Sequence, residues 1–291
     1  TDSVAVGYNA LTAQNNDAAN HNVAVGSSAG AAVTTGVNNT FIGGLAGDAI
    51  TTGIRHTALG QGSLSTETTG RAAVAVGFNA LATLNVGSNL ESYNVAVGSE
   101  AGAAMTVGLR NTIIGGLAGD ALTDADDNIA IGQGALGTDT LGSKSVAVGR
   151  AALATQNFTT AADTYNTAVG FQAGTAVTTA VQNTLIGAQV GDALTQGARN
   201  TAVGYVALSS DTLGQYSTAV GYAALFSSNQ TTAVNTYNVA VGYNAGGAVT
   251  TGLFNTLVGG LSGDALTDAD YNTGLGYLAL SSDTLGSTST A

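Results

Sequence analysis

The chain has 291 residues, of which 42 are glycine and none is proline, cysteine or tryptophan, a composition far from that of an average globular domain. Its formal net charge of −12 disfavours binding to nucleic acid and to anionic membranes, because no excess of basic residues is present to neutralise phosphate. No apolar stretch approaches the roughly 20 residues that a membrane span requires, so membrane insertion is not expected either.

A five-residue motif recurs along the chain, first as SVAVG at residues 3–7 and next as NVAVG at residues 22–26. There are 16 copies, and from the second copy onward the final glycines are separated by 17, 17, 17 and 21 residues in turn. This periodicity predicts 16 coils of 17–21 residues, grouped in a 72-residue super-repeat. The motif glycines are Gly7, Gly26, Gly43, Gly60, Gly77, Gly98, Gly115, Gly132, Gly149, Gly170, Gly187, Gly204, Gly221, Gly242, Gly259 and Gly276.

Each motif predicts a short β-strand. The residue three positions before the glycine is Val, Thr or Ile in all 16 copies, and the residue one position before it is Val, Ile or Leu. Since residues i and i+2 share one face of a strand, we expect these two columns to point into the core. Seventeen residues leave no room for a helix and its turns. We therefore predict an all-β parallel β-solenoid (β-roll) that forms a single repeat array over residues 1–291.

The residue between these two columns should lie on the opposite face of the strand. It is Ala in 11 copies, and larger residues stand there at Phe41, Ile113, Leu185 and Leu257. Because this face is apolar as well, either another strand of the same coil or a second chain must cover it, and a symmetric homo-oligomer is the economical solution. The motif therefore predicts a symmetric homo-oligomer.

Two further features of the repeat carry structural predictions. The residue four positions before the glycine is Asn in 11 copies, which predicts an Asn ladder, with His56 at one of its positions. The four-residue insertions should form outward loops at residues 82–93, 154–165 and 226–237, since they vary most while their flanks stay constant.

Acidic residues suggest one metal-site hypothesis. Asp124, Asp126 and Asp127 form an oxygen-rich cluster, so a Ca²⁺ site is one interpretation and a solvated loop is the alternative. No other cofactor is expected.

Aromatic residues often follow the motif glycine directly, where they would form a discontinuous stripe along one corner of the coils. Core or interface packing is one interpretation of this stripe, and contact with a saccharide or a receptor is the other. The residues are Tyr8, Phe78, Phe171, Tyr205, Tyr222, Tyr243 and Tyr277.

Nothing in the sequence indicates an enzyme. The string GQGALG at residues 132–137 matches a dinucleotide-binding pattern, but that pattern requires a following helix, which a 17-residue coil cannot hold. No set of Ser, His and Asp residues recurs that could support nucleophilic catalysis. A polysaccharide-degrading tailspike would need paired carboxylates, whereas the acids recur only once in several coils.

The SVAVG, NVAVG and NTAVG motifs, each followed by small residues, resemble the head-domain repeats of trimeric autotransporter adhesins of the YadA type and similar repeats in tail-fibre proteins of bacteriophages. The resemblance covers nearly the whole chain. It implies a left-handed parallel β-roll in which three chains lie side by side, and thus a homotrimer. The family's Val and Ile positions correspond to Val95 and Val97, to Ile129 and Ile131, and to Thr167 and Val169. The coils here are longer, and every fourth one carries an insertion.

The function expected from these observations is that of a structural, adhesive fibre segment without catalysis, located outside the cell, at the cell surface or on a virion. Its partners would be further copies of itself and a cell-surface or glycan receptor. One alternative is an ice- or surface-binding solenoid, suggested by the Thr-Thr pairs at residues 34–35, 51–52, 178–179 and 250–251. Another is the subunit of a self-assembling extracellular filament.

Both ends of the sequence fall within the repeat, and neither shows the divergent capping unit that usually ends a solenoid. We therefore expect the chain to be a fragment of a longer fibre.

Overall fold

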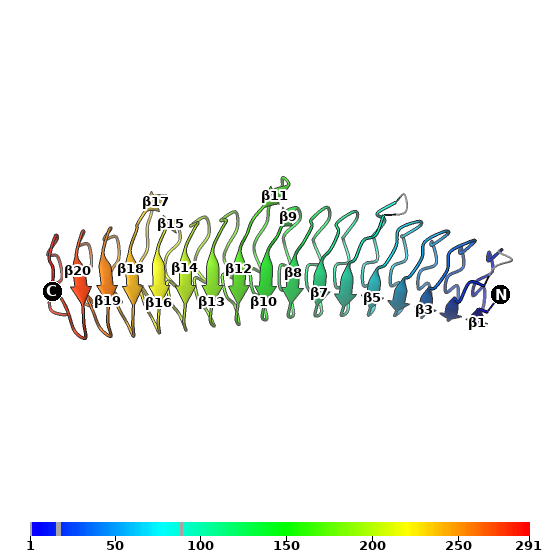
Figure 1. Cartoon of the computed structure of the whole chain (residues 1–291), viewed down its shortest axis with the longest axis horizontal. Helices are drawn as coiled ribbons and strands as arrows, with labels where there is room; N and C mark the ends of the chain where they lie inside the picture. The colour runs from blue at the N-terminus through cyan, green and yellow to red at the C-terminus, as the bar shows by residue number, and fades with distance from the viewer. Residues whose placement is uncertain (1, 16–18, 88–89) are drawn as a thin grey trace. The chain divides into compact units, whose positions relative to one another are not determined.

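The computed structural model describes residues 2–15, 19–87 and 90–291 of the chain. Within these residues the regular elements are short β-strands, and no helix is present. The chain forms a parallel β-solenoid of about 16 turns, with one motif strand in each turn (Figure 1). The predicted all-β parallel solenoid is thereby confirmed.

The chain divides into two compact units, and each motif strand has three residues. The first unit comprises residues 1–144 and 158–162, and the second comprises residues 145–157 and 163–291. In the first unit the motif strands are β1 (Val4–Val6), β2 (Val23–Val25), β3 (Thr40–Ile42), β4 (Thr57–Leu59), β5 (Val74–Val76), β6 (Val95–Val97), β7 (Thr112–Ile114) and β8 (Ile129–Ile131). In the second unit they are β10 (Val146–Val148), β12 (Thr167–Val169), β13 (Thr184–Ile186), β14 (Thr201–Val203), β16 (Thr218–Val220), β18 (Val239–Val241), β19 (Thr256–Val258) and β20 (Thr273–Leu275).

Four strands of two residues accompany the motif strands: β9 (Gly142–Ser143), β11 (Ala162–Asp163), β15 (Gly214–Gln215) and β17 (Val234–Asn235). Strand β17 lies in the insertion at residues 226–237 and pairs in parallel with β15 of the preceding coil. The insertion therefore adds a short sheet between its own coil and the coil before it.

Within each unit, every motif strand pairs in parallel with the motif strand of the next coil. Val95 pairs with Thr112 and Val97 pairs with Ile114, so that each column of the repeat becomes an in-register row of side chains. The predicted stacking of motif on motif is confirmed within both units.

The orientation predicted for the motif strands is wrong. The middle residue of the strand points into the coil: Ala96 is fully buried, whereas Val95 and Val97 on either side of it are partly exposed. A buried middle residue between two more exposed neighbours recurs in both units, and the outer residues Ile129 and Ile186 are exposed. Because both faces of the strand are apolar, the period of two could not show which face lies inside.

The interior of the coil is narrow, and its side chains are matched in size. Where the middle residue of the motif is large, glycine stands four residues after the motif glycine. Phe41 lies beside Gly30, where a Cβ atom would approach the Phe41 ring to 2.8 Å, and Leu185 lies beside Gly174 and Gly191. In seven of the eleven copies whose middle residue is Ala, Leu takes the glycine's place, as Leu81 does. The other four keep a glycine there and stand directly before a coil with a large middle residue: Gly30, Gly102, Gly174 and Gly246. The core therefore alternates large and small residues so that each layer is filled.

Left-handed backbone corners bend each coil. In the coil of Gly98, the corners are Glu100 with φ 58°, Gly102 with φ 60° and Arg110 with φ 58°. Non-glycine residues rarely adopt this conformation, because their Cβ atom then lies close to the backbone. Its recurrence in coil after coil indicates that the hydrogen bonds between stacked coils offset the local strain.

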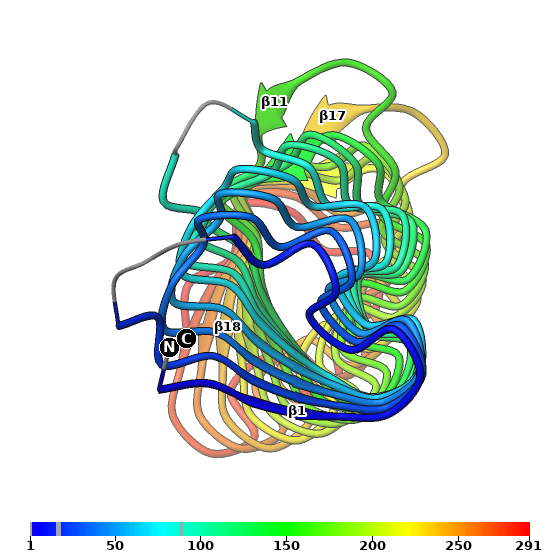
Figure 2. The same ribbon diagram turned by 90° about the vertical axis from the view of Figure 1, so that its right-hand side faces the viewer.

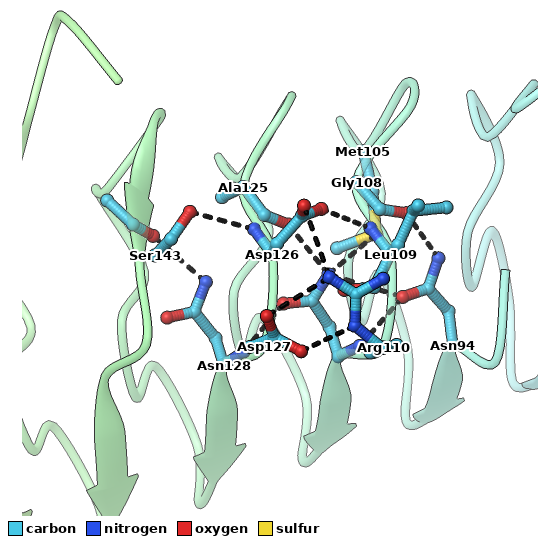
Figure 3. A network of polar contacts seen from close by, with 12 residues as sticks. Asn94, Met105, Gly108, Leu109, Arg110, Ala125, Asp126, Asp127, Asn128 and Ser143 are labelled. Carbon is cyan, nitrogen blue, oxygen red and sulfur yellow. Dashed lines mark hydrogen bonds and ion pairs between the residues drawn. The ribbon is translucent and has the colours of Figure 1, made fainter. Parts of the chain in front are cut away.

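The Asn ladder predicted from the sequence is confirmed. Asn111 is buried, its Oδ1 atom accepts the N–H of Asn128 at 2.9 Å, and its Nδ2 atom donates to the carbonyl of Ala125 at 2.8 Å. Asn94 and Asn128 repeat these contacts one coil to either side (Figure 3). Each amide thus links two coils and satisfies buried backbone groups that would otherwise lack partners.

The outward course predicted for the insertions is confirmed for the middle of the second and third ones, whereas parts of the predicted ranges are buried in the coil, as at Gln156 and Thr236. The ribbon leaves the coil around β11 and β17 (Figure 2), and residues 159–161 and 231–233 are exposed. Part of the first insertion, residues 88–89, lies outside the described residues.

Candidate functional site

The outward side of the motif strands carries partly exposed aliphatic side chains in coil after coil of each unit. We call this surface the outer motif face. It consists of two columns of side chains, those one residue and three residues before each motif glycine. Aliphatic side chains on it remain well exposed: Ile114 retains 38% of its surface, Leu59 41% and Ile186 40%. Because the pairing is in register, these residues form two parallel rows, and successive side chains within a row are separated by the step between neighbouring strands, about 4.8 Å.

One edge of the outer motif face is formed by the corner residue five positions before each motif glycine, which we call the corner column. In the first unit this column holds an ion pair (Figure 3), in which Arg110 donates from Nε to Asp127 at 2.6 Å and lies 3.4 Å from Asp126. The hydrogen bond from Arg110 lowers the pKa of the Asp127 carboxyl and raises that of the guanidinium. All three side chains are solvated, so this ion pair between neighbouring coils adds little to the stability of the fold.

These contacts bear on the calcium hypothesis. Asp126 also accepts the N–H of Leu109 at 2.7 Å, and Asp124 is exposed. Among residues 2–15, 19–87 and 90–291, no three His, Cys, Asp or Glu side chains are placed so as to hold a metal ion. The geometry favours an ion-pair ladder at Asp126 and Asp127, and the calcium site stays a prediction.

The aromatic stripe predicted after the motif glycine lies along the other edge of the outer motif face, and all of its members are exposed. In the second unit three of them stack on one another: the ring centroids of Tyr222 and Tyr243 are 5.3 Å apart, and those of Tyr205 and Tyr222 are 5.7 Å apart. Phe171 lies under the guanidinium of Arg150, at 5.7 Å. Tyr8, Phe78 and Tyr277 are also exposed, and Tyr277 lies over Gly260.

A second aromatic row, which the sequence analysis missed, occupies the corner column of the second unit. Tyr216, Tyr237, Phe254 and Tyr271 stack with centroid separations of 5.1, 5.7 and 4.8 Å, and Arg199 lies over Tyr216 at 5.4 Å. The signal was available, because all four aromatic residues stand five positions before a motif glycine. The outer motif face of this unit is therefore bordered by aromatic rings on both edges.

The first Thr of each pair behind the ice-binding hypothesis belongs to a hydrogen-bonded Thr ladder, which also includes Thr residues outside these pairs. Thr106 and Thr123 donate their hydroxyls to the carbonyls of Thr123 and Thr140 in the following coil, at 3.3 and 3.0 Å. Thr34 and Thr51 behave in the same way. The hydroxyl hydrogen of the first Thr is thus used within the stack, whereas the second Thr of each pair is exposed: Thr35, Thr52, Thr179 and Thr251.

Buried carboxylates hold the coils that precede an insertion. Glu67 is fully buried, its Oε1 atom accepts the N–H groups of Thr68, Thr69 and Gly70, and its Oε2 atom accepts that of Val86 in the next coil. Asp139 and Asp211 accept the corresponding N–H groups in their own coils. These acids therefore act as structural anchors at the base of the insertions, a role that their spacing alone did not reveal.

A second acidic column is only partly buried. Burial raises the pKa of Asp48, Asp120 and Asp192 above the ordinary aspartate value, and the nearby Glu100 adds to the effect at Asp120. These carboxyls are therefore less favourably solvated than surface acids.

His56 replaces Asn in the ladder and uses both of its ring nitrogens. Nδ1 accepts the N–H of Ala73 at 3.2 Å, which requires the proton on Nε2, and Nε2 donates to the carbonyl of Gly70 at 2.8 Å. Burial lowers the pKa of the imidazole, although the nearby Glu67 opposes this and Arg55 adds to it. The folded chain therefore holds His56 neutral.

We predict that His56 makes stability depend on pH. Below its ordinary pKa of 6.5 the imidazole binds a proton in the unfolded chain but not in the folded one. Stability should fall from that pH down to the lowered folded pKa, by up to about 1.4 kcal/mol per pH unit. Denaturant midpoints between about pH 5 and 8 measure the effect.

Replacement of His56 by Asn, the usual ladder residue, should remove this slope, whereas His21→Asn at an exposed corner should leave it in place. Equal slopes in the wild-type and His56→Asn proteins would show that His56 does not carry the dependence.

Comparison of the chain with protein-family models, with curated proteins and with solved structures found no match. Over the described ranges the structure has no pocket. The same residues contain no helix with the length and apolar character needed to cross a membrane.

Proposed function

We propose that this chain is a non-catalytic segment of a fibre that assembles from copies of itself and presents a repetitive surface for attachment. The outer motif face carries this proposal. It consists of two in-register rows of partly exposed Val, Thr, Ile and Leu side chains that recur in every coil of both units. Contiguous apolar surface of this kind usually marks an interface.

The proposed occupant of the outer motif face is a second copy of the chain. Its side chains repeat at the spacing of stacked strands, about 4.8 Å. A partner that matches such a surface over many coils must have the same period, and another copy in register meets this requirement. A symmetric oligomer would let every chain bury the same face. The choice of three subunits follows the resemblance to YadA-type heads.

Attachment is proposed to involve the aromatic rows at the edges of this face. In the second unit they remain exposed while stacked, as with Tyr222 at 50% and Tyr243 at 59%. Stacked rings direct their edges and hydroxyls outward, which suits hydrogen bonding to a cell-surface or glycan receptor. Such a segment would act outside the cell, at the cell surface or on a virion.

The 72-residue super-repeat is part of the same proposal. Large middle residues, paired glycines, buried acids and insertions each recur at this interval, and the contacts of Phe41 and Leu185 with neighbouring glycines support their mutual fit. A fibre could then be lengthened by whole super-repeats without disturbing the core.

Light scattering tests the assembly. We expect a particle of three times the chain mass of 28.3 kDa. Val97→Asp places a charge on the outer motif face and should yield a monomer with unchanged β-sheet circular dichroism. Val107→Asp, at another exposed valine, is the matched control and should remain trimeric. A wild-type monomer would overturn the oligomer, and a trimeric Val97→Asp protein would move the interface elsewhere.

A further inference from the structure

Exposed tyrosines in the second unit are arranged in stacked pairs one coil apart. The ring centroids are 5.1 Å apart in Tyr216–Tyr237, 5.3 Å in Tyr222–Tyr243 and 5.7 Å in Tyr205–Tyr222. In the first two pairs the rings are inclined by only 21° and 14°. All five side chains keep more than a third of their surface exposed, so small oxidants can reach them.

We propose that these pairs are sites of oxidative dityrosine cross-linking, with a peroxide-driven one-electron oxidant as the co-reactant. Each phenol would lose one electron and one proton to give a tyrosyl radical. Two radicals then form a carbon–carbon bond between the ring positions next to the hydroxyls, and the hydrogens on these carbons move to the oxygens. The pair loses two hydrogen atoms in total, and hydrogen peroxide takes them up as it is reduced to two molecules of water.

The solenoid supplies the proximity that this coupling needs. Radical coupling between free tyrosines is bimolecular, whereas here the parallel in-register coils hold the second ring beside the first. The rings are near the surface and can approach by rotation about their side-chain bonds, without movement of the backbone. Coupling should therefore occur within one chain, between neighbouring coils.

The corner column contains its own negative control. Phe254 separates Tyr237 from Tyr271, with centroid distances of 5.7 and 4.8 Å. Phenylalanine has no phenolic hydrogen to lose, so Tyr271 should escape coupling despite its close contact with the stack. The pattern of links should thus follow the chemistry of adjacent residues and not exposure alone.

A dityrosine link would join successive coils covalently. Tyr216 directly follows β15, and Tyr237 lies two residues after β17, the strand that pairs with β15 at the third insertion. A link there would close the inserted coil on its predecessor and oppose separation of the stack, since a cross-link restricts the unfolded chain.

The test treats the assembled protein with peroxidase and hydrogen peroxide, and maps cross-linked peptides by mass spectrometry alongside dityrosine fluorescence. We expect links at Tyr216–Tyr237 and at Tyr222 with Tyr205 or Tyr243, each with the loss of two hydrogen atoms. On a denaturing gel the product should keep the mass of one chain.

Conservative variants sharpen the assignment. Tyr237→Phe should abolish the link to Tyr216 and leave the links of Tyr222 unchanged, whereas Phe254→Tyr should bring Tyr271 into the cross-linked set. Absence of dityrosine, links that ignore these substitutions, or products with the mass of two or more chains would overturn the proposal.

Discussion

Aspartate at Ala96 is expected to disrupt the coils around β6, whereas aspartate at the neighbouring Val97 is not. Ala96 has no exposed surface, and its methyl group points into a coil interior lined by apolar side chains. A carboxylate there would have no partner and no room, so we expect a loss on the order of 4 kcal/mol or more in the free energy of unfolding.

Val97 provides the matched control because it lies in the same strand with its side chain directed outward. Its replacement should cost about 1 kcal/mol in the stability of a single chain, as for a polar residue on a strand surface. Thermal unfolding followed by circular dichroism, with hydrogen exchange of residues 90–115, distinguishes the two. Similar losses in both variants would contradict the orientation of the strand.

The second large effect is expected from Gly98→Ala. The motif glycines of successive coils stack directly, and a Cβ atom on Gly98 would lie 2.5 Å from the carbonyl oxygen of Gly115 and 2.6 Å from its carbonyl carbon. These are backbone atoms held in the ladder, so they cannot move aside without separating the coils. The φ angle of 142° adds strain for any residue with a side chain. We expect a loss on the order of 3 kcal/mol or more.

Gly134→Ala serves as the control for this substitution. Gly134 has a φ angle of 65°, but a Cβ atom there would meet no other atom within 4 Å. Gly134→Ala should therefore lower the free energy of unfolding only by the cost of a left-handed backbone at a non-glycine residue, about 1–2 kcal/mol. Denaturant unfolding of the two variants measures the difference, and equal losses would show that backbone conformation, not the close approach of the coils, makes glycine necessary at position 98.

The contacts of individual polar side chains could not be predicted from the repeat pattern of the sequence. Spacing placed His56 in the column of the Asn ladder, but only the fold shows that both of its ring nitrogens are engaged and that the Glu67 carboxylate accepts four backbone N–H groups. Arg110 and Asp127 are 17 residues apart and meet because each occupies the same corner of adjacent coils. The aromatic corner column follows a fixed spacing, five residues before the motif glycine, but only the fold shows that its rings stack.

The spacing of the motif was sufficient to predict the solenoid, the number and length of its coils, the Asn ladder and the outward insertions. In a stacked architecture the same contact returns at a fixed interval, so the sequence shows the same period. The side of the motif strand that lies inside could be read only from the folded chain. Both faces of the strand are apolar, so the width of the coil determines which face is buried. The interior holds the small side chain of Ala96, while the larger Val97 points outward. Phe41 fits inside only because neighbouring glycines leave space for its ring.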